Sequence, residues 1–313
     1  MKPQDFRDFL NRLGELTGEQ LRALSSAMSH SRGDAVAIIE ARFAADPCCP
    51  HCDGHTIQPW GHAGDLKRHR CKLCGRTFTA LTGTPLAGLH KREVWLEYAA
   101  ALLEQASVRR AAERCGIDKT TSFRWRHRFL EVPMANKPAC VSGIVEADET
   151  FILKSQKGSR KIEGRAPRKR GGKAKTPGLS TENHDAIMIV RDRHGATSDA
   201  ILPDLSGPSF AAVLKPIVAR DAMLVSDCRA AYGQFADEAG IPHISLNASA
   251  GQRNYLAYHI QNVNAYTSRL KGWLRPFKGV ASKYLTNYLG WHRMLDREEG
   301  RMTAAACLAA ALG

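Results

Sequence analysis

The sequence has no long hydrophobic run: no apolar stretch approaches the ~20 residues that a membrane-spanning helix needs. Residues 1–6 also lack the apolar core of a signal peptide, so we expect a cytoplasmic protein without a membrane partner. No internal repeat is visible, which excludes a repeat array. With 313 residues, 43% of them hydrophobic, the chain can fold into about two domains of ~150 residues.

Acidic residues are few compared with basic ones. The 31 Asp and Glu leave a net charge of +14 against 45 Lys and Arg, and such an excess favours a nucleic-acid partner. Ten of the basic residues lie between Lys154 and Lys175, where Glu163 is the single acid. We expect this glycine-rich basic insertion (154–178) to be a mobile loop that orders on DNA, although a solvated loop without a function is the alternative. Its predicted DNA contacts are Lys161, Arg165, Arg168, Lys169 and Arg170.

The nine cysteines do not suggest a secreted disulfide framework, because their number is odd and four of them form two Cys-x-x-Cys pairs. Cys49 and Cys52 are separated from Cys71 and Cys74 by eighteen residues, which is typical of a four-cysteine zinc site. Few aliphatic residues lie nearby, so the metal would replace a core. Four free thiols, a redox pair, or ligation by the adjacent Cys48 are the alternatives. Four thiolates leave no open position, so this zinc would be structural.

Residues 91–130 have the outline of a helix-turn-helix. Gly116 lies between two segments of helical periodicity, 108–115 and 118–130. The second segment carries Arg124, Arg126 and Arg128, which we expect to contact DNA. A plain three-helix packing unit remains the alternative.

The second half of the chain alternates between strand-like and helix-like patterns, which predicts an α/β domain. The expected strands are 141–153, 186–190, 197–202, 223–226 and 243–246. The expected helices are 209–219, 255–274 and 282–295.

Two aspartates lie in or at the end of hydrophobic strands, where a carboxylate is unusual unless it has a function. Asp148 lies within a hydrophobic strand, with Glu146 on the same face and Glu149 on the other. Asp227 ends a later strand, where open α/β sheets place their ligands. Together they favour a Mg²⁺ site, although either could be a turn former or a helix cap. Beyond them, Asn264 and Lys271 are seven positions apart and share one face of a helix.

The order of these features resembles the insertion-sequence DDE transposases of bacteria that have an N-terminal zinc ribbon. The resemblance covers residues 45–297. It is most specific in the cysteine pairs, in 148–150, in 226–232 and in the helix 259–271. It implies an α/β fold: an RNase H-like mixed sheet flanked by helices, preceded by a small zinc ribbon and a helix-turn-helix. The implied boundaries are an N-terminal helical segment 1–45, a zinc ribbon 46–84, a helix-turn-helix domain 85–135, a catalytic domain 140–297 and a tail 298–313.

The resemblance also implies a mechanism. Asp148 would bridge two Mg²⁺ or Mn²⁺ ions, Asp227 would hold one, Asn264 would complete the other, and Lys271 would offset charge at the scissile phosphate. The family has Glu where this chain has Asn264, although some members resemble it in having Asn there with a Lys one heptad on. Glu146, Tyr232 and His259 would help to position these ligands without contacting the metal.

The function implied is a homo-oligomeric, nucleoid-associated transposase. It would bind double-stranded DNA at the terminal inverted repeats of its element through the zinc ribbon and the helix-turn-helix, and would catalyse strand cleavage and strand transfer. The alternatives are a domesticated regulator that binds DNA without catalysis, in which Asn264 records the loss of activity, and a stand-alone zinc-binding module.

Overall fold

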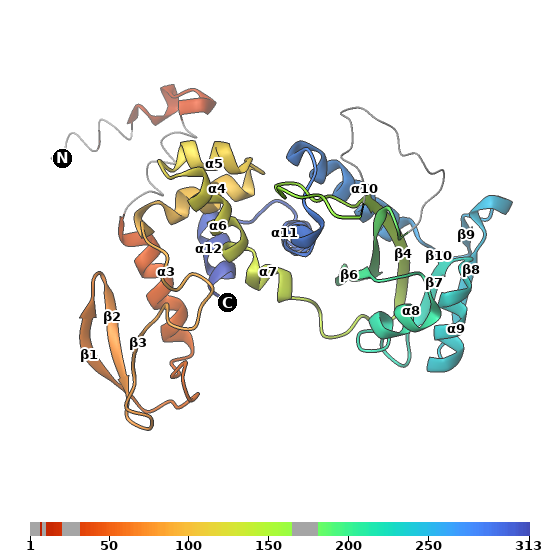
Figure 1. Ribbon diagram of the computed structural model, residues 1–313, viewed down its shortest axis with the longest axis horizontal. Helices are drawn as coiled ribbons and strands as arrows, with labels where there is room; N and C mark the ends of the chain where they lie inside the picture. Colours follow the sequence, from red (N-terminus) through yellow and green to blue (C-terminus); the bar gives the residue numbers. More distant parts are fainter. Residues whose placement is uncertain (1–6, 8–10, 21–31, 165–180) are drawn as a thin grey trace. The chain divides into compact units, whose positions relative to one another are not determined.

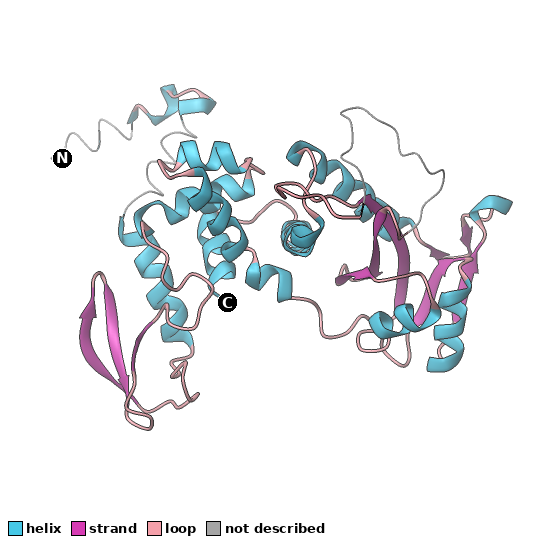
Figure 2. Ribbon diagram, viewed as in Figure 1, coloured by secondary structure: helices cyan, strands magenta, loops and turns pink. Residues whose placement is uncertain are grey.

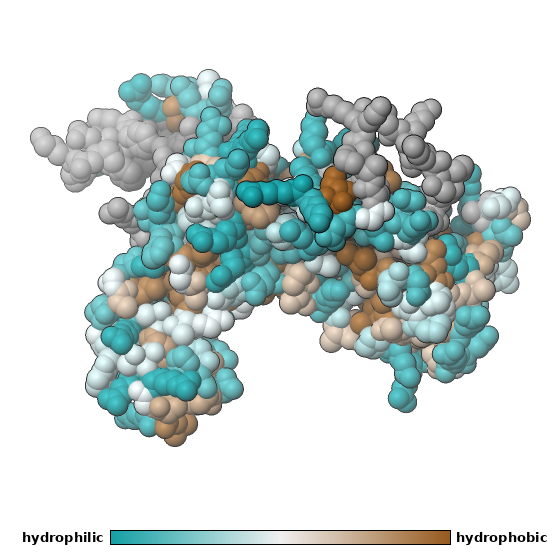
Figure 3. All heavy atoms as spheres, viewed as in Figure 1, coloured by the Kyte–Doolittle hydropathy of each residue, from teal (hydrophilic) through white to brown (hydrophobic). Residues whose placement is uncertain are grey.

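The computed structural model describes residues 7, 11–20, 32–164 and 181–313, which divide into two units (Figure 1). One comprises residues 1–132 and 301–313, and the other residues 133–300. Among the described residues, no helix combines the length and the apolar character needed to cross a membrane. Hydrophilic side chains cover much of the face shown in Figure 3.

The first unit contains a small three-stranded antiparallel sheet of β1 (Ile57–Ala63), β2 (Leu66–Cys71) and β3 (Thr77–Thr79) (Figure 2). Most of β1 is exposed, and Ile57 is its one large aliphatic residue. The buried cluster beside this sheet consists of only Cys49, Cys71 and Phe78, against which Phe43 and Ile57 pack. So small a core does not stabilise a sheet by apolar burial alone.

Helices make up the remainder of this unit. The helices with bounds among the described residues include α3 (Arg32–Ala45), α4 (Trp95–Leu103), α5 (Val108–Arg114), α6 (Lys119–Phe129) and α12 (Ala304–Leu312), with short 3-10 turns at Leu13–Glu15 and Arg92–Val94. Ser107 and Asp118 cap α5 and α6, accepting hydrogen bonds from the amides of Arg110 and Thr120. The turn between these helices uses Gly116 at φ 59°, a conformation that favours glycine.

An aromatic core holds these helices together. Trp95 and Tyr98 of α4 make edge-to-face contacts with Trp125 and Phe129 of α6, and all four side chains are almost fully buried. α12 packs on α3, α4 and α6, so the predicted tail closes the first unit as a helix. α7 (Glu131–Ala135) then leads into the second unit.

The second unit is built on a five-stranded mixed sheet with the order β6-β5-β4-β7-β8. Its strands are β4 (Ile144–Leu153), β5 (His184–Asp192), β6 (Thr197–Leu202), β7 (Met223–Asp227) and β8 (His243–Leu246). The pairs β4/β5 and β5/β6 are antiparallel, whereas β7 runs parallel to β4 and to β8. All five predicted strands are present, within a few residues of the expected bounds.

Helices cover both faces of this sheet. Val145 and Ala147 of β4 face α8 (Gly207–Leu214) and α9 (Ala230–Ala239), in a core that includes Phe210 and Tyr232. The other face packs against α10 (Gln261–Leu274) and α11 (Leu285–Arg297). The sheet is therefore the middle layer of three, and alternate residues of β4 face different layers.

Two expectations need correction. The helix predicted from Tyr255 begins only at Gln261, because residues 254–259 form a hairpin of β9 (Asn254–Tyr255) and β10 (Tyr258–His259) that turns through Leu256 at φ 54°. The start of the basic insertion is also anchored: Lys157 Nζ donates to the carbonyls of Phe277 and Gly279, at 3.0 and 2.9 Å. Residues 165–180 lie outside the described residues.

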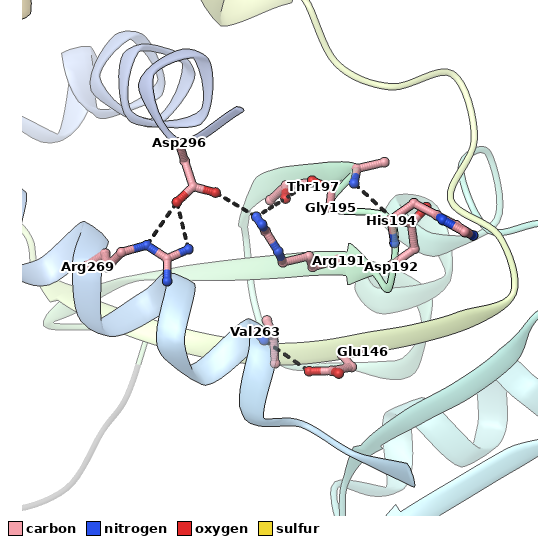
Figure 4. Close-up of polar contacts among 10 residues, drawn as sticks. Glu146, Arg191, Asp192, His194, Gly195, Thr197, Val263, Arg269 and Asp296 are labelled. Carbon is pink, nitrogen blue, oxygen red and sulfur yellow. Dashed lines mark hydrogen bonds and ion pairs between the residues drawn. The ribbon is translucent and has the colours of Figure 1, made fainter. Parts of the chain in front are cut away.

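Ion pairs fix α10 and α11 on the sheet (Figure 4). Asp296 of α11 accepts hydrogen bonds from Arg269 of α10 at 2.6 Å and from Arg191 of β5 at 2.8 Å. Burial opposes the ionised form of Asp296, but the two guanidiniums outweigh it and lower the pKa of this carboxyl. Arg293 of α11 pairs with buried Asp199 in the same way. Charge pairing thus supplements apolar packing on this face.

A glycine in α11 tests how tightly this helix packs. A Cβ on Gly290 would collide with the backbone of Met134, whereas a Cβ on Gly272 in α10 would meet nothing within 4 Å. We expect Gly290→Ala to lower the free energy of unfolding by about 1–3 kcal/mol through overpacking. Gly272→Ala should raise it by up to ~1 kcal/mol, because alanine favours helix. Urea unfolding of both variants makes the comparison, and equal stabilities would contradict the close approach.

Candidate metal centres

The first candidate centre is the set of four thiols predicted to bind zinc. Cys49, Cys52, Cys71 and Cys74 bring their sulfur atoms within 4.8 Å of one another. Cys49 and Cys74 are 3.7 Å apart, and Cys52 and Cys71 are 3.6 Å apart. A tetrahedral ion with Zn–S bonds of ~2.3 Å requires S···S separations of about 3.8 Å. The donor set therefore fits a structural zinc ion.

Two tight turns hold these sulfur atoms in place. In the first turn the amides of Cys52 and Asp53 donate to the Cys49 carbonyl, and in the second the amide of Gly75 donates to the Cys71 carbonyl. Gly75 has φ 73°, a conformation that favours glycine. Hydrogen bonds from the backbone of Cys74 and Leu73 lower the pKa of Cys71 to about 7, which favours the thiolate that a metal binds.

The second candidate centre lies where β7 ends beside β4. The parallel ladder pairs Glu146 with Val225, so its register continues to Asp148 and Asp227 two residues further on. One carboxylate oxygen each from Asp148, Glu149 and Asp227 lies within 4.8 Å of the others. The three carboxylates form the acidic cluster, and clustered oxygens of this kind suit a hard divalent cation.

Glu149 is the residue that sequence reasoning missed at this site. Strand alternation placed it on the opposite face from Asp148, yet its carboxylate joins the cluster. Asp227 is the last residue of β7, so the carboxylates of Asp148 and Glu149 both lie near it at the end of that strand. Glu149 follows Asp148 directly, and that adjacency was the available signal.

Burial and mutual repulsion destabilise the ionised form of these carboxyls. Burial raises the pKa of Asp148 to about 6, and the charge of Asp227 acts in the same direction, whereas Lys271 and Arg229 oppose it. Burial likewise raises the pKa of Glu149 to about 7, against the opposing charge of Arg229. Arg229 Nε lies 2.7 Å from Glu149 Oε1. A bound cation would relieve both penalties.

Glu146 anchors α10 to the strand that carries Asp148. Its carboxylate, fully buried, accepts hydrogen bonds from the amides of Asn262 and Val263 at 2.8 and 3.0 Å, and the second is drawn in Figure 4. Arg193 Nε and His259 Nδ1 approach it to 3.1 and 3.5 Å. A strand side chain thus satisfies orphan amides at the start of a helix.

Two residues of α10 were predicted to join the metal site. Asn264 and Lys271 are both exposed, on the helix that Glu146 holds. The positive charge of Lys271 lowers the pKa of Asp148. In Tyr232 of α9, burial raises the pKa of the phenol, and the charges of Glu149, Asp148 and Asp227 add to the shift.

The predicted DNA-contacting residues divide into three groups. Arg124 of α6 and Lys161 are exposed. Arg128, partly buried, donates to the carbonyls of Pro85 and Ala87. Arg126 is only 1% exposed and donates to the Ala106 carbonyl at 2.6 Å, so this residue is corrected from a DNA contact to a core residue. Outside the described residues lie Arg165, Arg168, Lys169 and Arg170.

Comparison with known proteins relates the second unit to a transposase domain. Residues 140–291, which include the whole mixed sheet and the acidic cluster, match the model of the ISXO2-like transposase domain. Over 255 residues, 80% of this chain and 86% of the relative, the chain is 23% identical to an uncharacterized protein in transposable element ISH50 of Halobacterium salinarum.

Two solved structures are also similar at 13% identity: a pre-cleavage Mos1 transpososome and a Mos1 transposase paired-end complex with left transposon end. The matches cover 70% and 69% of this chain and 79% and 78% of those chains, with TM-scores of 0.22 and 0.23.

The thiol cluster leads to a prediction about metal content. Cys52→Ser should remove most of the bound zinc and expose residues 46–84 to protease, because three thiolates hold the ion less well and the sheet lacks its own core. Cys48→Ser is the matched control, since Cys48 is outside the four-sulfur cluster. Zinc per chain from elemental analysis and limited proteolysis are the measurements. Equal zinc loss in both variants would refute the assignment.

Proposed function

We propose that this chain is an insertion-sequence transposase, because residues 140–291 match the model of the ISXO2-like transposase domain and a relative lies in a transposable element. It binds double-stranded DNA at the terminal inverted repeats of its element. It then catalyses strand cleavage and strand transfer with Mg²⁺ or Mn²⁺. The observation that carries this proposal is the meeting of Asp148 and Asp227 at one end of the mixed sheet within the matched domain.

The chemistry proposed for this site is phosphoryl transfer. When bound, divalent ions at such a site lower the pKa of an attacking water or 3′-hydroxyl and stabilise the leaving oxygen. Asp148 and Asp227 hold them, and Asn264 contributes an amide oxygen from α10. Lys271 offsets the negative charge that develops at phosphorus. The mixed sheet between layers of helices supports the RNase H-like arrangement that such a site requires.

DNA binding is assigned to the first unit and to the basic insertion. Arg124 on α6 and Lys161 at the start of the insertion are exposed and would contact phosphates, and a bound zinc ion would keep the β1–β3 sheet of the first unit folded. Because transposition joins two ends of one element, the active form is a homo-oligomer on DNA, associated with the nucleoid in the cytoplasm.

A second candidate function is a regulator that binds DNA without cutting it. Asn264 favours this reading, because an amide at the position of the family's Glu holds a cation with less charge. The two candidates differ in whether the acidic cluster is used.

Replacing the two aspartates distinguishes them. We expect Asp148→Asn and Asp227→Asn each to reduce nicking of a duplex carrying the DNA that flanks the gene by roughly a thousandfold or more, because each removes a metal ligand. Asp237→Asn on the exposed side of α9 is the control and should nick normally. Tight binding by the native chain without cleavage in Mg²⁺ or Mn²⁺, together with cleavage gained by Asn264→Glu, would establish the regulator instead.

Two arginines of α6 separate DNA contact from folding. Arg124→Ala should weaken binding to the same duplex and reduce the slope of log affinity against log salt by roughly 0.9, because one phosphate contact is lost. Its unfolding should be unchanged. Arg126→Ala should instead lower the free energy of unfolding by about 1–3 kcal/mol, because it leaves the Ala106 carbonyl unsatisfied. Filter binding and thermal unfolding measure the two effects. An unchanged salt slope in Arg124→Ala would remove α6 from the DNA interface.

A further inference from the structure

Glu149 is a member of the acidic cluster for which the proposed mechanism has no use. It lies between Asp148 and Thr150 on β4, and its side chain is only 2% exposed. One of its carboxylate oxygens lies within 4.8 Å of an oxygen of Asp148 and of an oxygen of Asp227. Burying a carboxylate is costly unless a cation or hydrogen bonds offset it, so its position in this cluster calls for a reason.

Charge at the proposed metal site provides one reason. With Asp148, Asp227 and Asn264 as ligands, the protein supplies two negative charges and one neutral amide. Asn264 is exposed on α10, whereas the Glu149 carboxylate already lies beside both aspartates. Carboxylates are the ligands that Mg²⁺ and Mn²⁺ prefer, and a third restores the charge that an amide at 264 withholds.

The ion pair with Arg229 does not fully account for Glu149. The Nε atom of Arg229 is 2.7 Å from Oε1 of Glu149, but the two atoms do not form a hydrogen bond of normal geometry. The Arg229 side chain is 34% exposed, so it can turn away from the cluster when another cation arrives. A single guanidinium also cannot neutralise three carboxylates.

Tyr232 provides a second, independent observation. Its side chain is fully buried on α9, and its hydroxyl has no hydrogen-bond partner among the described residues. The charges of Glu149, Asp148 and Asp227 act on it, in that order of size. An unsatisfied buried hydroxyl costs about 1–3 kcal/mol, and a hydrated cation beside Glu149 offers it a water oxygen as acceptor.

We infer that Glu149 is the third carboxylate ligand of the divalent-cation site. β4 supplies it directly after Asp148, and it takes the place of a glutamate at position 264. The inference rests on the proposed metal-dependent function and deepens it. In the rival reading Glu149 is only the counterion of Arg229 and does not contact the metal.

Binding of Mn²⁺ to the zinc-loaded, full-length protein tests this without requiring activity. Free Mn²⁺ is followed by electron paramagnetic resonance during titration. Glu149→Gln should weaken binding by about tenfold or more, because loss of groups that merely orient ligands already costs 10–100-fold. Glu238→Gln makes the same chemical change at an exposed position of α9 and should bind as the native protein does. Native affinity in Glu149→Gln would overturn the inference.

A double variant removes two ambiguities. Glu149→Gln alone leaves Arg229 without its partner, so it can unfold the site, and it also changes the net charge. Glu149→Gln combined with Arg229→Gln keeps the net charge and removes both partners of this ion pair together, so neither is left without the other. If Glu149 is a ligand, this variant still binds Mn²⁺ about tenfold more weakly or worse. If it binds as tightly as the native protein, Glu149 is only a counterion and the inference fails.

Asp148→Asn separates this failure from failure of the proposed function. If the native protein binds Mn²⁺ and Asp148→Asn does not, the metal site stands, and the Glu149 variants alone decide the inference. If the native protein does not bind Mn²⁺ at all, both the metal-dependent function and the role of Glu149 are overturned.

Discussion

The candidate active site depends on one buried contact, between the carboxylate of Glu146 and the first turn of α10. Glu146 is fully buried and receives the amides of Asn262 and Val263, with Arg193 beside it. An uncompensated charge there would cost several kcal/mol, so the helix start is fixed where those donors are. Because Glu146 is two residues from Asp148 on the same face, this contact ties the strand that carries an acidic ligand to the helix that carries Asn264 and Lys271.

Much of this site follows from sequence because it depends on local rules. Asp148 and Asp227 are recognisable as carboxylates in hydrophobic strands, and parallel register then brings them together. Spacing likewise predicts the four thiols. The failures occur where tertiary structure overrides alternation or helical periodicity. Glu149 joins the acidic cluster although alternation assigns it to the other face of β4, and buried Arg126 donates to a backbone carbonyl that no sequence pattern reveals.

The two units are stabilised by different interactions. Around the β1–β3 sheet, the buried apolar cluster of the described residues is small and comprises Cys49, Cys71 and Phe78, whereas the four thiols match the spacing of a tetrahedral zinc site. The five-stranded sheet has a large apolar core on one face and ion pairs such as Arg293 with Asp199 on the other. Loss of a metal should therefore destabilise the β1–β3 sheet of the first unit. The second unit depends instead on desolvated ion pairs, which form only when the helices pack on the sheet.

β4 shows how one strand combines these demands. Val145 and Ala147 face the apolar core, Glu146 binds α10, and Asp148 and Glu149 join the acidic cluster. Its rigidity comes from the antiparallel ladder with β5, which runs along its whole length, while β7 pairs with only its first residues. The carboxylates therefore lie on a strand that is held on one side and open on the other. That arrangement holds repelling carboxylates close together at the end of β7.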